Sequence, residues 1–247
     1  TLWHTLSLHD ALPISFLAAG VLKGIVGLGM PIVVIGVTAP VFGLTTAIQL
    51  VIIPGAVTNV RQALRGGMLR RILVRQKWLL ATTVVGIWFG TLVLAGGEGV
   101  WLSRLLGTAL VAYALYALFL PQLPAPGRAE PVLAPLVGLA SGMMSGMVGV
   151  WAVPGVVWMA LLRLPRDELV QTLGIVFVTI SVALGGSFAQ RALLDTAPLL
   201  LSMLALPAML AGLLIGERLR HRLPEAGFRR VFLVALAVLG VTIAATA

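Results

Sequence analysis

The chain contains a succession of apolar runs, most of them about as long as a bilayer is thick. About twenty residues of α-helix, rising 1.5 Å each, span a hydrocarbon core of roughly 30 Å. Within that core every backbone hydrogen bond must be satisfied internally, and runs of this length indicate helices. The sequence predicts an all-α polytopic membrane protein with about eight hydrophobic segments, at residues 16–37, 40–60, 78–96, 100–120, 132–161, 169–188, 196–216 and 229–247.

The composition excludes an ordinary soluble domain. Hydrophobic residues make up 60% of the chain and charged residues 10%, whereas soluble domains carry about 25% charged residues. The absence of cysteine excludes disulfides and thiolate metal sites, and we expect neither a metal nor a cofactor. The excess of 17 Lys and Arg over 8 Asp and Glu lies mostly in two short connections, where membrane topology explains it. We therefore expect the lipid bilayer as partner and no nucleic acid.

Two glycine-rich apolar segments echo each other along the chain. Glycine at high density weakens a helix and favours a break. In lipid, a broken helix is tolerated only where it lines an enclosed or wet cavity, so we expect a duplicated chain that binds a solute between the two segments. The alternative is that the glycines only allow helices to pack closely. The two sets are Gly20, Gly24, Gly27 and Gly29 followed by Pro31, and Gly138, Gly142, Gly146 and Gly149 followed by Pro154.

The duplication also predicts the domain organisation. We expect a first transmembrane repeat at residues 16–120, an inter-repeat loop at 121–131 and a second repeat at 132–247. Residues 1–15 differ in character from the rest, and the run at 9–14 resembles a translated sequencing adapter, which predicts a non-native leader. The alternative is a short natural amphipathic leader; it lacks the basic start of a secretory signal.

The charged connections constrain the topology. The connection 61–77 has six basic residues and no acid, and 217–230 has five arginines against two glutamates, so both indicate the cytoplasmic face. Eight full crossings would place them on opposite faces. We therefore expect segment 132–161 to be re-entrant from the cytoplasm and, by symmetry, segment 16–37 to be re-entrant from outside, which gives inverted repeats. Eight full crossings with an imperfect charge pattern are the alternative.

At these glycines the sequence resembles the sulfite exporter TauE/SafE family, also called the toluene-sulfonate uptake permease group, over residues 16–247. In that family a motif Gly-x3-Gly-x2-Gly-x-Gly-Gly, followed by apolar residues and proline, opens each half. This sequence departs from the motif in two ways: Met30 and Val150 stand where the family has a further glycine, and Lys23 is a residue that the motif does not include. These departures make the family's best-known substrates less certain for this chain than the family's fold. The resemblance implies export or import of small anions such as sulfite, sulfonates or sulfur-containing organic acids. The matching residues are Gly20, Gly24, Gly27, Gly29 and Pro31 in the first copy, and Ser141, Gly142, Gly146, Gly149 and Pro154 in the second.

Lys23 is the most distinctive candidate for substrate binding. A cation deep in an apolar segment costs roughly 2.5–3.5 kcal/mol and is a functional candidate by default. It could balance an anionic substrate, or it could extend to a membrane face. Helix breaks present backbone N–H groups to an oxyanion, and the glutamines after each motif could line the path or bond between helices. The predicted substrate-binding residues are Lys23, Gly27, Gly29, Pro31, Gln49, Gly146, Gly149, Pro154 and Gln171.

These features predict a secondary transporter of small anions in the cell (inner) membrane, and not an enzyme. No His or carboxylate lies near the middle of a predicted segment, where it could pair with a serine or hold a metal. No Gly-x4-Gly-Lys-Ser/Thr loop is present, which excludes direct use of ATP by this chain. A channel or a non-transporting membrane subunit is the alternative, and a membrane-embedded enzyme is a weaker one. Substrate identity, direction, proton coupling and homo-oligomer formation stay open.

Overall fold

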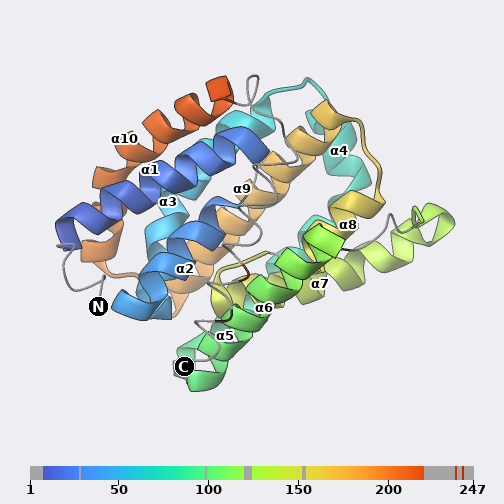
Figure 1. The fold of residues 1–247 in the computed structure, drawn as a ribbon. Coiled ribbons are helices and arrows are strands. Elements are labelled where there is room, and N and C mark those ends of the chain that lie inside the picture. Colours follow the sequence, from blue (N-terminus) through green and yellow to red (C-terminus); the bar gives the residue numbers. More distant parts are fainter. Residues whose placement is uncertain are drawn as a thin grey trace.

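The structure is a computed structural model that describes residues 8–27, 29–97, 99–119, 124–151, 154–219, 237 and 241. Throughout these residues the fold is helical, without a strand (Figure 1). The elements are α1 (Leu8–Val26), α2 (Met30–Phe42), α3 (Leu44–Leu64), α4 (Leu69–Arg75), α5 (Lys77–Ala95), α6 (Val100–Phe119), the 3-10 turn η2 (Gly127–Ala129), α7 (Glu130–Val148), α8 (Gly155–Leu161), α9 (Arg166–Gln190) and α10 (Thr196–Leu219).

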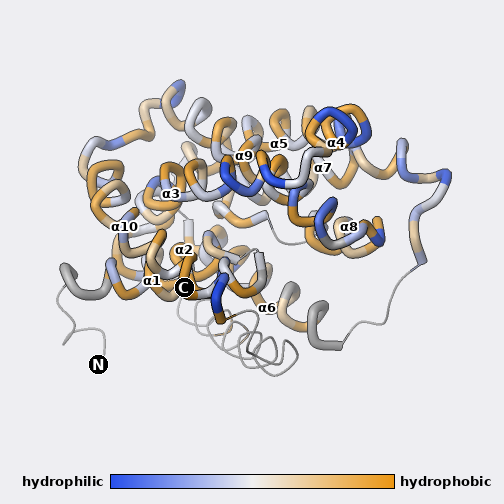
Figure 2. Tube along the Cα trace, turned by 90° about the horizontal axis from the view of Figure 1, so that it is seen from above, coloured by the Kyte–Doolittle hydropathy of each residue, from blue (hydrophilic) through white to orange (hydrophobic). Residues whose placement is uncertain are grey.

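Most of the helices are strongly apolar. In the described part of the chain five are long and apolar enough to cross a membrane: α3, α5, α7 with η2, α9 and α10. Shorter apolar helices occupy residues 12–25, 30–42 and 100–112. Figure 2 shows hydrophobic colouring along most helices and a hydrophilic stretch at α4. The prediction of an all-α polytopic membrane protein is confirmed, whereas the segment predicted at 229–247 lies outside the described residues apart from positions 237 and 241.

Both glycine-rich segments are broken helices. The break between α1 and α2 contains Gly29, and the break between α7 and α8 starts at Gly149. These glycines have φ angles of 99° and 75°, in the left-handed region that a side chain disfavours. The expected breaks are therefore present. The run predicted at 16–37 as one segment consists of two helices for this reason, and the first of them already begins at Leu8.

The chain reverses direction at each break. Near the end of α1, Lys23 bonds to Thr58 and Asn59, which lie near the end of α3. Because α3 begins at the opposite end of the bundle, α2 must run back to reach it (Figure 1). Likewise α7 ends beside the last turns of α5, whereas α9 begins beside the end of α3, so α8 also runs back.

Close glycine contacts join the helices in two parallel pairs. Gly24 of α1 lies against Gly216 of α10, and Gly146 of α7 lies against Gly90 of α5. A methyl group at any of these positions would overlap the backbone of the partner helix. In lipid, where the hydrophobic effect between helices is absent, such small residues let backbones approach and gain van der Waals contact. The glycines therefore determine which helices pair.

Helices α3 and α9 run antiparallel between the two pairs. Gly174, near the start of α9, contacts the backbone of Ala63 near the end of α3, whereas Gly185 further along α9 contacts Ile52. Figure 1 shows both helices in the middle of the molecule, with α1 and α10 on one side and α5 and α7 on the other. Both broken helices therefore pack against this central pair.

One end of the bundle collects ion pairs. Arg61 at the end of α3 pairs with Glu217 at the end of α10, 3.2 Å apart. Arg75 of α4 pairs with Glu130 at the start of α7, 2.9 Å apart, and this hydrogen-bonded carboxylate raises the pKa of Arg75. The connection 61–77 and the end of α10 therefore lie at the same end of the bundle, whereas residues 220–230 of the second predicted basic connection lie outside the described residues. We name this end of the bundle the basic end.

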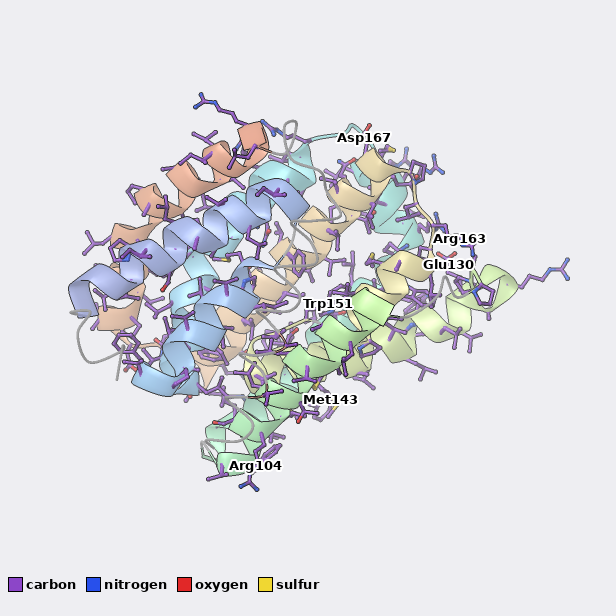
Figure 3. The ribbon with its side chains drawn as sticks, viewed as in Figure 1. Arg104, Glu130, Met143, Trp151, Arg163 and Asp167 are labelled. Carbon is purple, nitrogen blue, oxygen red and sulfur yellow. The ribbon has the colours of Figure 1, made fainter. Side chains whose placement is uncertain are left out.

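The side chains labelled in Figure 3 mark the two ends of the bundle. Glu130, Arg163 and Asp167 lie toward the basic end, Arg104 lies at the other end, and Trp151 lies between them. The short helix α4, which the sequence prediction treated as part of a loop, runs along the basic end with its arginines exposed.

Candidate functional site

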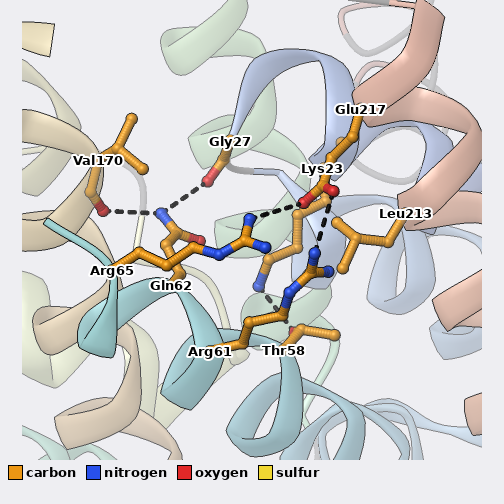
Figure 4. A pocket seen from close by; sticks show the side chains of 10 residues that line it. Lys23, Gly27, Thr58, Arg61, Gln62, Arg65, Val170, Leu213 and Glu217 are labelled. Carbon is orange, nitrogen blue, oxygen red and sulfur yellow. Dashed lines mark hydrogen bonds and ion pairs between the residues drawn. The ribbon is translucent and has the colours of Figure 1, made fainter. Parts of the chain in front are cut away.

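A cavity of about 100 Å³ opens at the basic end, between the ends of α1, α3 and α10 and the start of α9 (Figure 4). Three of its lining side chains are cations and one is a carboxylate, so the lining is electropositive. Two of the predicted substrate-binding residues, from the end of the first glycine-rich helix, lie here. The lining residues are Lys23, Gly24, Gly27, Thr58, Arg61, Gln62, Arg65, Val170, Leu213 and Glu217.

Lys23 reaches across from α1 to α3. Its side chain is buried, with 5% exposed, and its Nζ donates hydrogen bonds to Thr58 Oγ1, at 2.8 Å, and to Asn59 Oδ1. Among the residues that the structure describes, no carboxylate lies within ion-pair distance of Nζ. Its ammonium thus bonds to α3 rather than extending into solvent. Neutral oxygens orient the charge but do not neutralise it, and a buried charge without a counter-ion is costly.

Two arginines and a glutamate form the outer wall of the cavity. Glu217 Oε2 lies 3.2 Å from Arg61 Nη2, and Glu217 Oε1 lies 3.5 Å from Arg65 Nη1. The side chains are 36%, 36% and 61% exposed for Arg61, Glu217 and Arg65, so solvent screens both pairs. None of these three residues was among the predicted site residues, because a basic connection is by default only a sign of orientation.

Gln62 connects the first break to α9. Its Nε2 donates to the carbonyl oxygens of Gly27, at 3.3 Å, and of Val170, at 2.9 Å. Gly27 has a φ of 84°, and among the described residues no atom beyond its chain neighbours lies within 4 Å of the position where a Cβ would stand. Gly27 lines the cavity, but its N–H donates to the carbonyl oxygen of Lys23 at 2.7 Å, so both of its backbone polar groups are already paired.

Gly29 and Pro31 form the start of α2. Gly29 precedes the helix in a left-handed conformation. Pro31 lies in the first turn, where its missing N–H breaks no helical hydrogen bond. Neither residue lines the cavity, and their contact with a solute stays a prediction.

The second break lies at a different depth along α3. Gly149 packs against Ile35 of α2 and Ile48 of α3, whereas Gly27 is bound by Gln62 of α3. Fourteen residues of helix separate the two α3 positions, which corresponds to about 21 Å. The cavity therefore contains residues of the first break and none of the second.

The other predicted residues of the second motif have packing positions in the structure. Gly146 packs on α5, and Pro154 precedes α8. Their solute contact also stays a prediction. Three buried polar groups near this motif were not among the predicted site residues: the hydroxyls of Ser141, a motif residue, and of Ser145, and the indole N–H of Trp151. Among the residues that the structure describes, none of the three has a hydrogen-bond partner.

Each of the two predicted glutamines forms hydrogen bonds with backbone at the far end of the other glutamine's helix. Gln171 of α9 binds backbone at and after the end of α3, and Gln49 of α3 binds backbone after the end of α9. Gln171, near the start of α9, accepts from the N–H of Met68 at 3.0 Å and donates to Ala63 O at 2.9 Å. Gln49, near the start of α3, accepts from the N–H of Asp195 at 2.7 Å. These bonds are of the inter-helix kind considered as the alternative role. Whether either amide also contacts a solute is a prediction that these bonds leave open.

The helices, the two breaks and the electropositive cavity together define a class of protein. They are the features of a multi-pass integral membrane protein. The family model of the sulfite exporter TauE/SafE matches residues 12–243. The chain therefore belongs to this family of membrane transporters, as the glycine motifs indicated. Comparisons with curated proteins and with solved structures give no match.

Proposed function

We propose that the protein is a secondary transporter that moves sulfite, sulfonates or other sulfur-containing organic anions across the cell (inner) membrane. The observation that carries this proposal is Lys23, a buried cation beside the first helix break whose hydrogen-bond partners in the described residues are neutral. A small anion would supply the missing negative charge. Gly27 lines the same cavity, and its missing side chain leaves room for a small anion beside Lys23.

The proposed architecture is an inverted repeat with two re-entrant helices. The glycine contacts support it, since α1 packs on α10 as α7 packs on α5, each pair in parallel. The antiparallel α3 and α9 support it as well, because inverted repeats place equivalent helices in opposite directions. In this arrangement α1 and α2 enter from outside, and α7 and α8 enter from the basic, cytoplasmic end.

The proposed solute path runs between the two glycine-rich segments. Because Gly27 and Gly149 lie beside positions of α3 that are about 21 Å apart along the helix, a small anion would meet them in succession. It would enter at Lys23, pass along the α3 and α9 pair, and reach the hydroxyls of Ser141 and Ser145 before the second break, which have no hydrogen-bond partner among the described residues. A narrow path with successive polar groups suits a solute that must bind and leave again.

Reconstitution into liposomes tests the proposal. Sulfite, thiosulfate, sulfoacetate and taurine are offered with and without a proton gradient, and initial uptake rates are measured. We expect saturable flux for at least one anion and a loss of about tenfold or more in the Lys23→Met protein. Lys77→Met is the matched control, because Lys77 is the chain's other lysine and lies exposed outside the cavity.

Three results would count against the proposal in different ways. Flux that does not saturate would indicate the channel alternative. An unchanged rate in Lys23→Met would remove Lys23 from the path. No flux and no binding for any of the anions would overturn the transporter assignment for these solutes.

A further inference from the structure

The cavity at the basic end carries more positive than negative charge. Lys23, Arg61 and Arg65 face a single carboxylate, Glu217. Two positive charges are therefore uncompensated within the lining. They are also arranged in depth, because Lys23 is buried, whereas Arg61 and Arg65 are partly exposed at the mouth.

The other helix pair shows that these charges are not needed for packing. In the pair formed by α1 and α10, Gly24 contacts Gly216. Lys23 immediately precedes Gly24, and Glu217 immediately follows Gly216. In the pair formed by α7 and α5 the same contact joins Gly146 and Gly90. The residues at the corresponding places there are the neutral Ser145 and Thr91. The contact between Gly146 and Gly90 is as close as the contact between Gly24 and Gly216, although its neighbouring residues are small and neutral. Helix packing therefore does not explain why Lys23 and Glu217 are charged.

Glu217 is placed as a bound anion would be. Its two oxygens face two different arginines, at 3.2 Å and 3.5 Å. Charge-assisted hydrogen bonds between such groups are usually shorter, about 2.7–2.9 Å, and all three side chains are at least one-third exposed. A long, screened pairing is easily exchanged for another anion. Lys23 lies on the inner side of the same cavity, where Glu217 forms no ion pair with it.

We propose that Glu217 is a tethered competitor at an anion site formed by Lys23, Arg61 and Arg65, and that a small divalent anion displaces it from the two arginines. This inference rests on the proposed function. One charged group of the ligand binds Lys23, next to Gly27, where no side chain fills the space. The second takes the position of the Glu217 carboxylate, so an anion with two charged groups is preferred over one with a single group. Release of Glu217 frees the end of α10 from α3.

Binding to the purified full-length chain in detergent or nanodiscs tests this site. The dissociation constants of sulfoacetate, with a sulfonate and a carboxylate, and of methanesulfonate, with the sulfonate alone, are measured by calorimetry. We expect Glu217→Gln to tighten the binding of sulfoacetate, within the roughly 5- to 150-fold range of coupled equilibria, and to tighten that of methanesulfonate less, because its single charged group does not need the position of Glu217. Glu130→Gln is the matched control, since it breaks the Arg75 pair at the same end but lies outside the cavity; it leaves both constants unchanged.

The outcomes separate this inference from the proposed function. If Lys23→Met weakens binding while Glu217→Gln leaves it unchanged or weaker, Glu217 is a helix clamp, the inference is overturned, and the proposed function stands. Absence of binding of either anion to the unmodified chain, together with no flux for any anion, overturns both. Should Glu217→Gln fail to fold, Arg65→Gln takes its place, because Arg65 is largely exposed. It is expected to reduce the preference for sulfoacetate over methanesulfonate, and an unchanged preference overturns the inference.

Discussion

Glu217 at the end of α10 is paired with Arg61 at the end of α3, 156 residues earlier in the chain. The pair lies at the mouth of the cavity that contains Lys23. Arg61 and Glu217 are also the first residues of the basic connections 61–77 and 217–230. If all eight predicted segments crossed the membrane, these two connections would lie on opposite faces. The ion pair therefore supports an arrangement in which at least one segment enters and leaves on the same side.

Cysteine labelling provides a direct test of this topology. The chain contains no cysteine, so single cysteines at Arg70, Arg218 and Ala192 report without background. All three positions are exposed, the first two at the basic end and Ala192 after the end of α9. We expect a membrane-impermeant maleimide to label Arg70→Cys and Arg218→Cys from the cytoplasmic side only.

The third position serves as the internal control for sidedness. Ala192→Cys should react from the outside, because α9 carries the chain away from the basic end. Labelling of Arg70→Cys and Arg218→Cys from opposite sides would rule out the re-entrant arrangement.

The glycine contacts predict a sharp difference between glycine positions. A methyl group at Gly216 or Gly146 would overlap the backbone of the partner helix, whereas at Gly185 the nearest atom is an Ile52 side-chain carbon at 3.6 Å. Overpacking typically costs about 1–3 kcal/mol. We therefore expect Gly216→Ala and Gly146→Ala to lower the unfolding free energy by this amount in detergent. Gly185→Ala should stay within about 0.5 kcal/mol of the parent; equal effects at all three positions would contradict the packing.

Much of the fold was predictable because lipid imposes simple rules. Apolar length, the glycine motifs and the positions of basic residues depend on local sequence, and they predicted the helices, the breaks and the shared basic end. The same rules did not predict α4, because its seven residues are too short and too basic to appear as an apolar run. They predicted a break within the run at 16–37 but not where α1 ends and α2 begins, since no polar residue other than Lys23 interrupts that run.

The candidate site was only partly predictable. Lys23 and Gly27 stood out because a buried cation and a glycine break are unusual in an apolar segment. Arg61 and Glu217 did not, because their role depends on a contact between helices that are far apart in the sequence. Local sequence patterns also did not predict that the two breaks lie beside well-separated positions of α3. Those positions depend on how far each broken helix extends into the bundle before the chain turns back.

The neutral partners of Lys23 predict a coupled effect on stability. Asn59 is buried and its carbonyl accepts a hydrogen bond from the ammonium. Loss of a hydrogen bond to a charged group costs about 1.5–3 kcal/mol, so Asn59→Leu should destabilise the protein by that amount. In the Lys23→Met background the same change should cost less, with a coupling energy of about 0.5–3 kcal/mol in a double-mutant cycle of unfolding free energies. Additive effects would mean that Asn59 does not serve to hold the lysine.

The last prediction separates the two roles considered for the glutamines. Gln171→Leu removes the acceptor of the Met68 N–H and the donor to Ala63 O, and an unpaired buried group costs about 1–3 kcal/mol. The free energy of unfolding should therefore fall. Gln49→Leu should act similarly through the N–H of Asp195, but less strongly, because only one of its two bonds is short. If the glutamines brace these connections, anion dissociation constants measured by calorimetry stay the same in both variants; a weaker affinity at unchanged stability would instead assign the amides to the solute path.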